Sequence, residues 1–328
     1  MSRRSISLNV RQVLVAALCL TGLSQAAADP YPTRPVRLIV SYAPGGTSDL
    51  VGRAMAQKMG ALLGQSFVIE NRGGAGGMIG ADIVAKAPAD GYTFLVAASG
   101  PIAFLPALSE RMPYDVERDF ATVGNLVTVP NLVLVRPGGP FKSLAELVAF
   151  AKKPANIVKF GSAGIGSSGH ISGELLNTLA GIRMEHVPYR GSGPAMLGLI
   201  AGDVDVMFDN LPSAMTQVQG GNLTGLAVMS RERSVIAPQF PTTAEVGFPD
   251  FLIGSSTGLL APKNTPQAAI TAVEKALRYM AEDPETRAQL AKYSADLDFM
   301  DSAAYRAWIH AEIARWSRIG REASIRIH

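Results

Sequence analysis

The amino-acid sequence predicts an α/β protein with two lobes that are joined by crossing strands. Strand-like and helix-like patterns alternate almost throughout residues 36–319, as they do in layered α/β proteins with largely parallel sheets. In each half of the chain, at residues 42–49 and 161–170, a glycine-rich loop follows an apolar strand-like run and opens a helical pattern. About 300 residues are enough for one large domain or two of ordinary size.

The first 28 residues have the pattern of an export signal. Three arginines precede an apolar run at residues 13–23, and Ala26-Ala27-Ala28 supplies small residues for cleavage before Asp29. The apolar run is too short to span a membrane. We therefore expect a signal peptide over residues 1–28, cleaved near Ala28, and a periplasmic protein. Residues 2–6 partly resemble a twin-arginine signal, so the secretion route stays open.

Loss of the leader changes both the charge and the cysteine content. The full chain has 30 basic and 27 acidic residues, and the leader holds three arginines and no acid, so 27 of each remain. This balance gives no reason to expect a nucleic-acid partner. The single cysteine, Cys19, also lies in the leader. The mature protein must therefore be stabilised by its core, without disulfides or thiolate metal sites.

Strand patterns follow one another along the whole mature chain. They lie at residues 36–40, 67–70, 92–97, 132–135, 157–160, 184–187, 204–208, 223–229 and 258–261. Between the third and fourth, the segment 101–131 contains several prolines and little periodicity, and we expect it to be irregular.

Helical patterns lie between most of these strands. Apolar residues from Leu50 to Leu62 recur at spacings that place them near one helix face. Ser143 and Glu146 have the spacing of a capping box, so a helix should begin at Leu144. The final helices are expected near residues 266–281, 284–292 and 302–319, packed back on the first half.

The loop at residues 42–49 has the composition of an anion site. Its residues are Tyr42, Ala43, Pro44, Gly45, Gly46, Thr47, Ser48 and Asp49, and a helical pattern starts at Leu50. The glycines let the backbone approach a ligand closely, and the three polar residues after them are types that cap helices. The first amides of a helix have no partner within it, and the helix dipole favours an anion there. The alternative interpretation is an ordinary turn between a strand and a helix.

The loop at residues 161–170 fits two kinds of ligand. Gly164–Gly169 satisfies the dinucleotide pattern G-x-G-x-x-G, and Glu185 lies roughly where a ribose-binding acid belongs. However, nicotinamide cofactors are scarce outside the cytosol, and the strand before this loop is not the first of its lobe. The same glycines and serines suit a small anion, so we expect no cofactor and keep an exported NAD-dependent enzyme as an alternative.

Nucleophilic and metal chemistry have weaker support. Ser167, Ser168 and His170 are close in sequence, and Asp205 or Asp209 is placed to orient a base. Neither serine lies in a G-x-S-x-G elbow, and residues two apart on a helix do not face each other. The four histidines show no metal-ligand spacing. We expect no catalytic residue and no metal site.

Polar residues also follow several strand patterns. Asp209 comes directly after the strand at 204–208, Tyr189 follows another, and Ser99 follows a third. In open α/β sheets the ligand contacts lie at these carboxyl ends. For Asp209 a helix cap ahead of Pro212 is an equally good interpretation.

At these motifs the sequence resembles the exported solute receptors of tripartite tricarboxylate transporters, often called Bug receptors. The matching runs are Arg37–Val40, Ala43–Asp49, Glu70–Arg72, Gly74–Gly77, Asp90–Thr93, Pro113–Asp115, Asp119-Phe120, Gly166–Ser168 with His170, His186–Gly191, Asp209–Ser213 and Gly258–Pro262. They span nearly the whole mature chain in the order found in that family. One departure is Ser255-Ser256-Thr257, which replaces a more aromatic run, so the sequence does not name the ligand.

The resemblance implies a hinged, two-lobed receptor of the Venus flytrap type, in which each lobe is a mixed, mostly parallel sheet flanked by helices. Lobe 1 would be residues 29–130 with 253–328, and lobe 2 residues 131–252. A small carboxylate would bind between them, held by Gly45, Gly46, Thr47, Ser48 and Asp49 on one lobe, by Ser162, Ala163, Gly166, Ser167 and His170 on the other, and with Tyr42, Ser99, Tyr189 and Asp209 near the cleft.

Such a receptor is a monomer without catalytic activity that delivers its ligand to the membrane subunits of a transporter. A receptor that signals to a sensor kinase ectodomain is the alternative that the sequence leaves open.

Overall fold

The computed structural model describes residues 31–327. The expected signal peptide and its cleavage near Ala28 lie outside the described residues. None of the helices in this part of the chain is long and apolar enough to cross a membrane.

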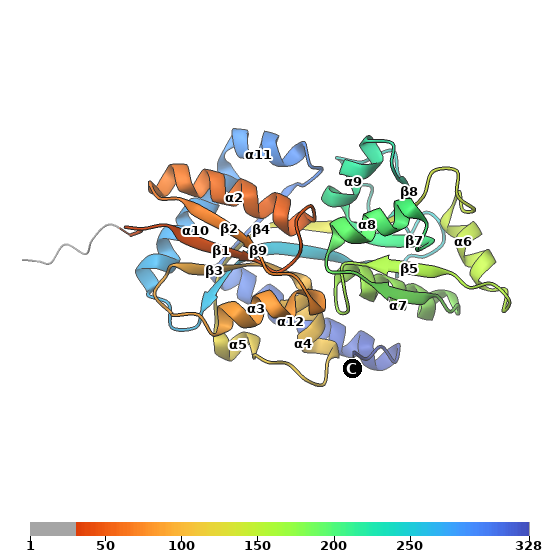
Figure 1. Ribbon diagram of the computed structural model, residues 1–328, viewed down its shortest axis with the longest axis horizontal. Coiled ribbons are helices and arrows are strands. Elements are labelled where there is room, and N and C mark those ends of the chain that lie inside the picture. Colours follow the sequence, from red (N-terminus) through yellow and green to blue (C-terminus); the bar gives the residue numbers. More distant parts are fainter. Residues whose placement is uncertain (1–30, 328) are drawn as a thin grey trace, which may run out of the picture.

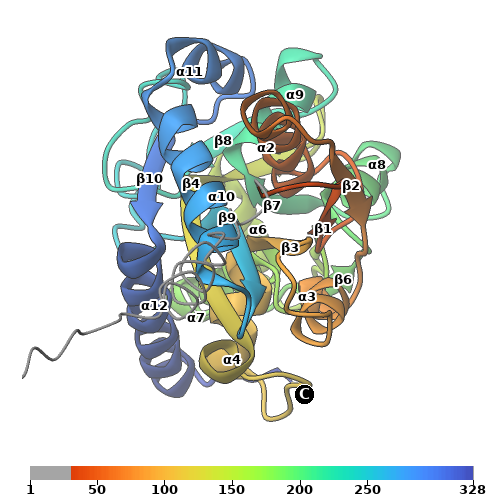
Figure 2. The same ribbon diagram turned by 90° about the vertical axis from the view of Figure 1, so that its left-hand side faces the viewer.

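Lobe 1 is built on a mixed sheet in the strand order β2-β1-β3-β9-β4, with β10 paired to β4 (Figures 1 and 2). Its strands are β1 (Val36–Val40), β2 (Phe67–Asn71), β3 (Thr93–Ala98), β9 (Gly254–Pro262), the first part of β4 (Phe120–Val135) and β10 (Leu297–Asp301). β1 pairs parallel with β2 and β3, whereas β9, β4 and β10 pair antiparallel. Parallel pairing, as expected, is found for β1, β2 and β3, which alternate with helices along the chain. The remaining strands of lobe 1 pair antiparallel.

Helices cover both faces of this sheet. They are α2 (Thr47–Leu63), α3 (Met78–Ala85), α10 (Gln267–Glu282), α11 (Pro284–Ala291) and α12 (Ser302–Glu322), with the short segments η1 (Ala75–Gly77), η2 (Gly100–Phe104), α4 (Leu105–Leu108) and α5 (Val116–Asp119). In Figures 1 and 2, α2 and α11 lie above the sheet and α3, α4 and α12 below it. Alternation along β1 explains this, because Leu38 packs in the core with α2 while Ile39 packs with α3 and α12.

Lobe 2 repeats the arrangement with a smaller sheet. The last part of β4 pairs antiparallel with β7 (Val206–Asn210) and β8 (Thr224–Val228), and β5 (Lys159–Ser162) pairs parallel with β7 and with β6 (Glu185–Pro188). The helices are α6 (Leu144–Ala151), α7 (Ser168–Ala180), α8 (Ser192–Ala201) and α9 (Leu211–Gln219). One face of this sheet packs on α8 and α9 and the other on α6 and α7.

Two strands, β4 and β9, connect the lobes. β4 pairs with β9 as far as Pro130 opposite Gly254, and from Asn131 onward it pairs with β7. The lobes also share apolar packing on one side, where Phe104 of η2 and Trp316 of α12 belong to the same core as the lower face of lobe 2. The division at residues 130 and 253, as a boundary between moving bodies, stays a prediction.

Some local predictions are confirmed and others are wrong. α6 begins at Leu144, because the Ser143 hydroxyl accepts the Glu146 amide as an N-cap. The segment 101–131 is not irregular throughout, since β4 begins at Phe120. The first glycine loop leads into a helix that begins at Thr47 rather than Leu50, and its N-cap is Gly46 without any side-chain cap.

Candidate ligand-binding site

A small cavity lies where the two lobes meet. Its volume is about 20 Å³, room for roughly one water molecule. It is lined by Tyr42, Gly46, Thr47, Ser48, Ala98, Gly100, Ala163, Ser167, Ser168, Ser192, Asp209, Asn210 and Ser255. These residues lie at or just beyond the carboxyl ends of β1, β3, β5, β6 and β7, or on the crossing strand β9. The cavity therefore occupies the position at which open α/β sheets place their ligands.

The N-termini of four helices converge on this cavity. Gly46, Thr47 and Ser48 lie at the start of α2, Ser167 and Ser168 at the start of α7, Ser192 at the start of α8 and Asn210 at the start of α9. Within residues 31–327, the amides of Gly46, Thr47 and Ser48 have no hydrogen-bond acceptor. Unpaired amides and helix dipoles aimed at one point form an anion-binding site.

Asp209 is the one charged side chain among the described residues that line the cavity. Only 3% of its surface is exposed, and its Oδ1 accepts a hydrogen bond from the Ser192 hydroxyl at 2.7 Å. The Ser213 hydroxyl donates to Oδ2. Burial raises the pKa of Asp209 to about 6, although the hydroxyls of Ser213 and Ser192 oppose this rise. Asp209 is not the N-cap of α9, because Asn210 holds that position.

Asp49, in contrast, faces away from the cavity and fixes the first loop. Its Oδ2 accepts the Gly45 amide at 3.1 Å and the Arg53 guanidinium at 3.1 Å, and its Oδ1 accepts the Asn71 amide at 3.0 Å. These bonds explain how a charged side chain with 4% exposure is tolerated in the first turn of α2. The role of Asp49 in this structure is to hold the backbone of the anion loop.

The lobes touch each other through hydroxyls and glycines. The Thr47 hydroxyl of α2 lies 3.0 Å from the Ser213 hydroxyl of α9. A Cβ on Gly76 in lobe 1 would overlap the carbonyl oxygen of Ile165 in lobe 2, and one on Gly100 would lie 3.1 Å from the Gly166 oxygen. Glycine at these positions lets the two backbones come together beside the cavity.

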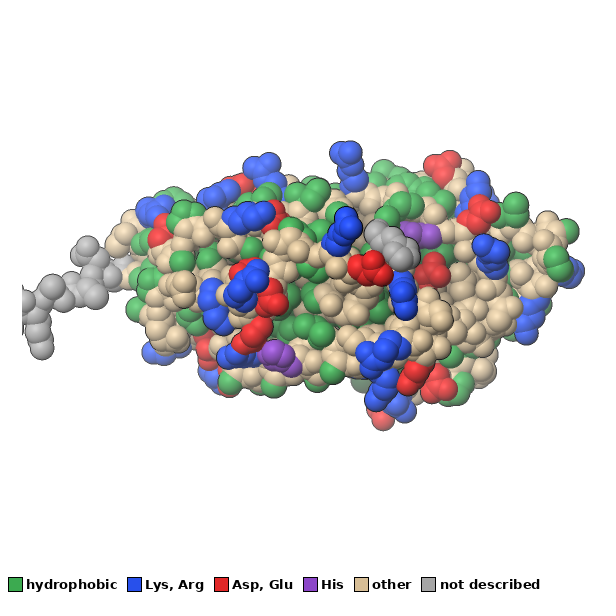
Figure 3. Space-filling model, turned by 90° about the horizontal axis from the view of Figure 1, so that it is seen from below, with side chains coloured by type: hydrophobic (Ala, Val, Ile, Leu, Met, Phe, Trp, Pro, Cys, Tyr) green, Lys and Arg blue, Asp and Glu red, His purple; other side chains and the backbone are tan. Residues whose placement is uncertain are grey.

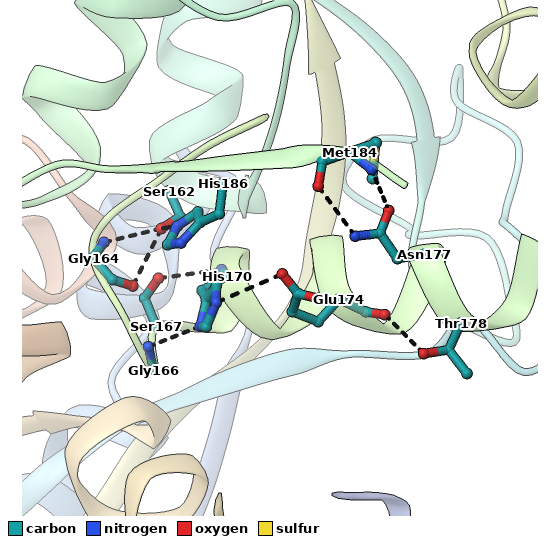
Figure 4. Close-up of polar contacts among 10 residues, drawn as sticks. All are labelled: Ser162, Gly164, Gly166, Ser167, His170, Glu174, Asn177, Thr178, Met184 and His186. Atoms are coloured by element: carbon teal, nitrogen blue, oxygen red, sulfur yellow. Dashed lines mark hydrogen bonds and ion pairs between the residues drawn. The ribbon is translucent and has the colours of Figure 1, made fainter. Parts of the chain in front are cut away.

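Two stacked histidines support the second loop from behind (Figure 4). The rings of His170 and His186 lie 4.1 Å apart between centroids. Nδ1 of His170 accepts the Gly166 amide at 3.1 Å, and Nε2 of His186 lies 2.7 Å from the Ser162 hydroxyl. Burial lowers the pKa of His170 to about 4, and burial together with His170 lowers the pKa of His186 to about 3. Both rings are neutral at physiological pH.

This geometry gives no support to a nucleophilic site. His170 contacts the Gly166 amide rather than Ser168, and Ser167 acts as the N-cap of α7 by accepting the His170 amide. The sequence did not suggest the contact between Ser162 and His186, but Ser162 is fully buried and does not line the cavity. A nucleophile needs access to its substrate.

The dinucleotide pattern is also placed wrongly for its ligand. Gly164–Gly169 does lie between β5 and α7. Glu185, however, is the first residue of β6 and is paired with Lys159 at the start of β5. The acid and the glycine loop therefore lie at opposite ends of parallel strands, whereas a ribose contact requires the carboxyl end.

The structure brings seven of the predicted site residues to the cavity, namely Tyr42, Gly46, Thr47, Ser48, Ala163, Ser167 and Asp209. Gly45, Asp49, Ser99, Ser162, Gly166 and His170 lie behind them as supports, and Ser99 does so by accepting the Ser256 amide at 2.9 Å. Tyr189 lines a separate open cavity of about 560 Å³ that Gly164 and Ile165 also border. As ligand contacts, all fourteen stay predictions.

The predicted ligand contacts leave out six residues that line the cavity, namely Ala98, Gly100, Ser168, Ser192, Asn210 and Ser255. Asn210 lies in the run Asp209–Ser213, and Ser192 directly follows the run His186–Gly191. A rule that includes every helix start would have found both. Ser255 precedes no helix and reaches the cavity from the crossing strand β9.

Other chemistry finds no support on the surface. Within residues 31–327 no group of three or more potential metal ligands is present. The face in Figure 3 shows Lys and Arg interspersed with Asp and Glu. On α12, Arg315 pairs with Glu312, and Arg306 with Glu117. This mixture is typical of a solvated surface and not of a nucleic-acid interface.

Two lobes around a cavity that faces helix N-termini define the class of periplasmic solute-binding proteins. A family model described as "Tripartite tricarboxylate transporter family receptor" matches residues 51–325. BugT of Bordetella pertussis is 34% identical over 302 residues, covering 92% of this chain and 93% of BugT. The chain belongs to this family of periplasmic tripartite tricarboxylate transporter receptors, and the resemblance drawn from its motifs is confirmed.

Solved structures agree with this assignment. Rpa4515 of R. palustris, solved with adipate, is 34% identical and superposes with a TM-score of 0.87 over 90% of this chain and 99% of its own. MatC from Rhodopseudomonas palustris, with bound malate, is 32% identical with a TM-score of 0.83 over 88% of this chain and 99% of its own. Both structures hold a dicarboxylate, and the two-lobed fold is confirmed.

Proposed function

We propose that the mature protein captures a small carboxylate in the interlobe cavity and delivers it to the membrane subunits of a tripartite transporter, without catalysing a reaction. One observation carries the site: Gly46, Thr47 and Ser48, whose amides are unpaired, line a cavity together with the first residues of α7. Charge-assisted bonds to such amides hold a carboxylate without a lysine or arginine. The carboxylates bound by Rpa4515 and MatC agree with this chemistry.

Entry of the ligand requires the lobes to separate. A cavity of about 20 Å³ is smaller than any dicarboxylate, since it holds roughly one water. We infer that β4 and β9 bend as the hinge, and that closure then excludes water and strengthens the bonds to the carboxylate. The monomeric, exported state expected from the sequence is part of this proposal.

Thermal unfolding of purified, ligand-stripped protein tests the function. Saturation at about 100 times the dissociation constant adds roughly 2.7 kcal/mol, which for a chain of this length raises the melting temperature by about 5–10 °C. We expect this shift with one or more mono-, di- or tricarboxylates and none with NAD. A shift with NAD alone, or turnover of any bound compound, would overturn the proposal.

A charge placed in the first loop locates the site. Gly46 has φ −86° as the N-cap of α2, a position at which aspartate is a preferred residue. Gly46→Asp should therefore fold but lose the carboxylate-dependent shift, because its carboxylate occupies the anion position. Gly46→Ala adds the same Cβ without charge and serves as the control. If both variants lose the carboxylate-dependent shift equally, or if both keep it, the ligand binds elsewhere.

A further inference from the structure

Asp209 already occupies the positive ends of two of the four helices. Its Oδ1 accepts the hydroxyl of Ser192, the first residue of α8, and its Oδ2 accepts the hydroxyl of Ser213 in the first turn of α9. A carboxylate at these N-termini satisfies their dipoles. The N-termini of α2 and α7, which lack such a built-in anion at the cavity, are the ones left for the carboxylate of a ligand.

A ligand carboxylate at α2 and α7 lies close to Asp209, because all these residues line one small cavity. Two carboxylates in a buried site repel each other unless a proton or a hydrogen-bond donor lies between them. Lys and Arg side chains are absent from the lining contributed by residues 31–327. Each oxygen of Asp209 accepts from one serine hydroxyl, and a carboxylate has about four acceptor sites. It therefore retains acceptor capacity.

We propose that Asp209 is a specificity-determining residue that selects carboxylates carrying a hydroxyl or ammonium group close to the bound carboxylate. The donor group hydrogen-bonds to Asp209 while the carboxylate binds the amides of α2 and α7. This inference rests on the proposed function, since it needs a carboxylate in this cavity. A ligand without the donor group leaves its carboxylate and that of Asp209 close together with no hydrogen between them, and this repulsion weakens its binding.

Matched ligand series measure the selection directly. Each series keeps the carbon chain and changes one substituent: propionate, lactate and alanine; succinate, malate and aspartate; glutarate, 2-hydroxyglutarate and glutamate. Isothermal calorimetry at pH 7.5 should show that, in the series of the right length, a hydroxy or amino member binds at least tenfold more tightly than the unsubstituted one. Asp209→Asn should reduce that ratio to less than threefold, mainly by weakening the substituted ligand.

Asp203→Asn is the control, because Asp203 is exposed just before the same strand, and its ratio should equal that of the unaltered protein. Equal affinity for substituted and unsubstituted members, or an unchanged ratio in Asp209→Asn, would overturn the role of Asp209 while carboxylate binding still stands. If none of the carboxylates binds, the proposed function fails and this inference with it. Even if Asp209→Asn does not fold, the unaltered protein alone shows whether substituted carboxylates bind more tightly than unsubstituted ones.

Discussion

The hydroxyl of Thr47, the first residue of α2, lies 3.0 Å from the hydroxyl of Ser213 in α9 and accepts the Ser213 amide at 3.3 Å. The two residues belong to different lobes and are buried. Because Ser213 also donates to Asp209, a chain of hydrogen bonds runs from one lobe to the carboxyl group of Asp209 in the cavity. Closure of the lobes and the state of Asp209 are thus linked through one side chain.

Removal of the Thr47 hydroxyl should favour separated lobes. Thr47→Val keeps the shape of the side chain but leaves the Ser213 amide without its acceptor in the closed form, at a cost of about 1–3 kcal/mol. Small-angle scattering of the ligand-stripped variant should give a larger radius of gyration than the unaltered protein. Thr122→Val, which removes a hydroxyl bonded to Ser302 within lobe 1, is the control. Identical scattering from both variants would contradict the link.

A methyl group on Gly76 should block closure. The added Cβ would meet the carbonyl oxygen of Ile165 across the lobes, so the closed contact cannot form. The matched control is Gly138→Ala, because Gly138 has a similar φ of +69° against +61° for Gly76 but nothing within 4 Å of an added Cβ. Backbone strain of about 1–2 kcal/mol is common to both. Only Gly76→Ala should lose the thermal shift caused by a carboxylate, and retention of that shift would show that this contact is dispensable.

The buried histidines should make the fold sensitive to acid. The pKa of His186 falls from an ordinary value near 6.5 to about 3, so below pH 6.5 the unfolded chain binds a proton that the folded chain does not. Stability is therefore lost as the pH decreases, by at most about 1.4 kcal/mol per pH unit for this group. Between pH 7 and 5, urea unfolding of His186→Phe should show a smaller loss than the unaltered protein, by up to about 2 kcal/mol.

His186→Phe preserves the ring stack, and the Ser162 hydroxyl keeps its bonds to Gly164. His310→Gln removes an exposed histidine of α12 and controls for the loss of a titrating group in general. The assignment fails if His186→Phe and the unaltered protein lose equal stability between the two pH values.

Asp209 should affect stability in the opposite direction. Its folded pKa of about 6 lies above the ordinary value of 3.8, so the folded chain holds a proton that the unfolded chain has released between these values. Stability contributed by the neutral acid is lost as the pH rises from 4 through 6. Tyr42, the titratable neighbour, stays neutral because burial raises its pKa. The free energy of unfolding of Asp209→Asn, measured relative to that of the unaltered protein, should therefore increase between pH 4 and 7.5. A difference that does not change with pH would refute the raised pKa of Asp209.

Local patterns predicted most of the fold because they depend on neighbours in sequence. The apolar alternation of β1 and the cap at Ser143 act within a few residues. The first part of β4, Phe120–Pro130, was not predicted as a strand. It is buried between β9 and β10, and its residues do not alternate between apolar and polar. Such a strand is recognised by its partners, which lie more than a hundred residues away.

Site residues at the start of a helix could be predicted from the sequence, whereas a site residue within a strand, such as Ser255, could not. Thr47 and Ser167 can be recognised in the sequence because each is a small polar residue that directly follows a glycine. Whether Asp49 or Asp209 faces the cavity depends on hydrogen bonds from other segments, Asn71 for one and Ser192 for the other. Spacing along a sequence carries no information about those partners.

The paired strands that join the lobes restrict how the lobes can move relative to each other. β4 and β9 are hydrogen-bonded to each other from Phe120 opposite Pro262 to Pro130 opposite Gly254, so neither can slide or swivel alone. In the hinge motion that we propose, the two strands therefore bend together as one ribbon. A ribbon that bends as one unit would bring the helix ends around the cavity back to the same alignment after each release. The protein would then lose little conformational entropy of its own when the next solute binds.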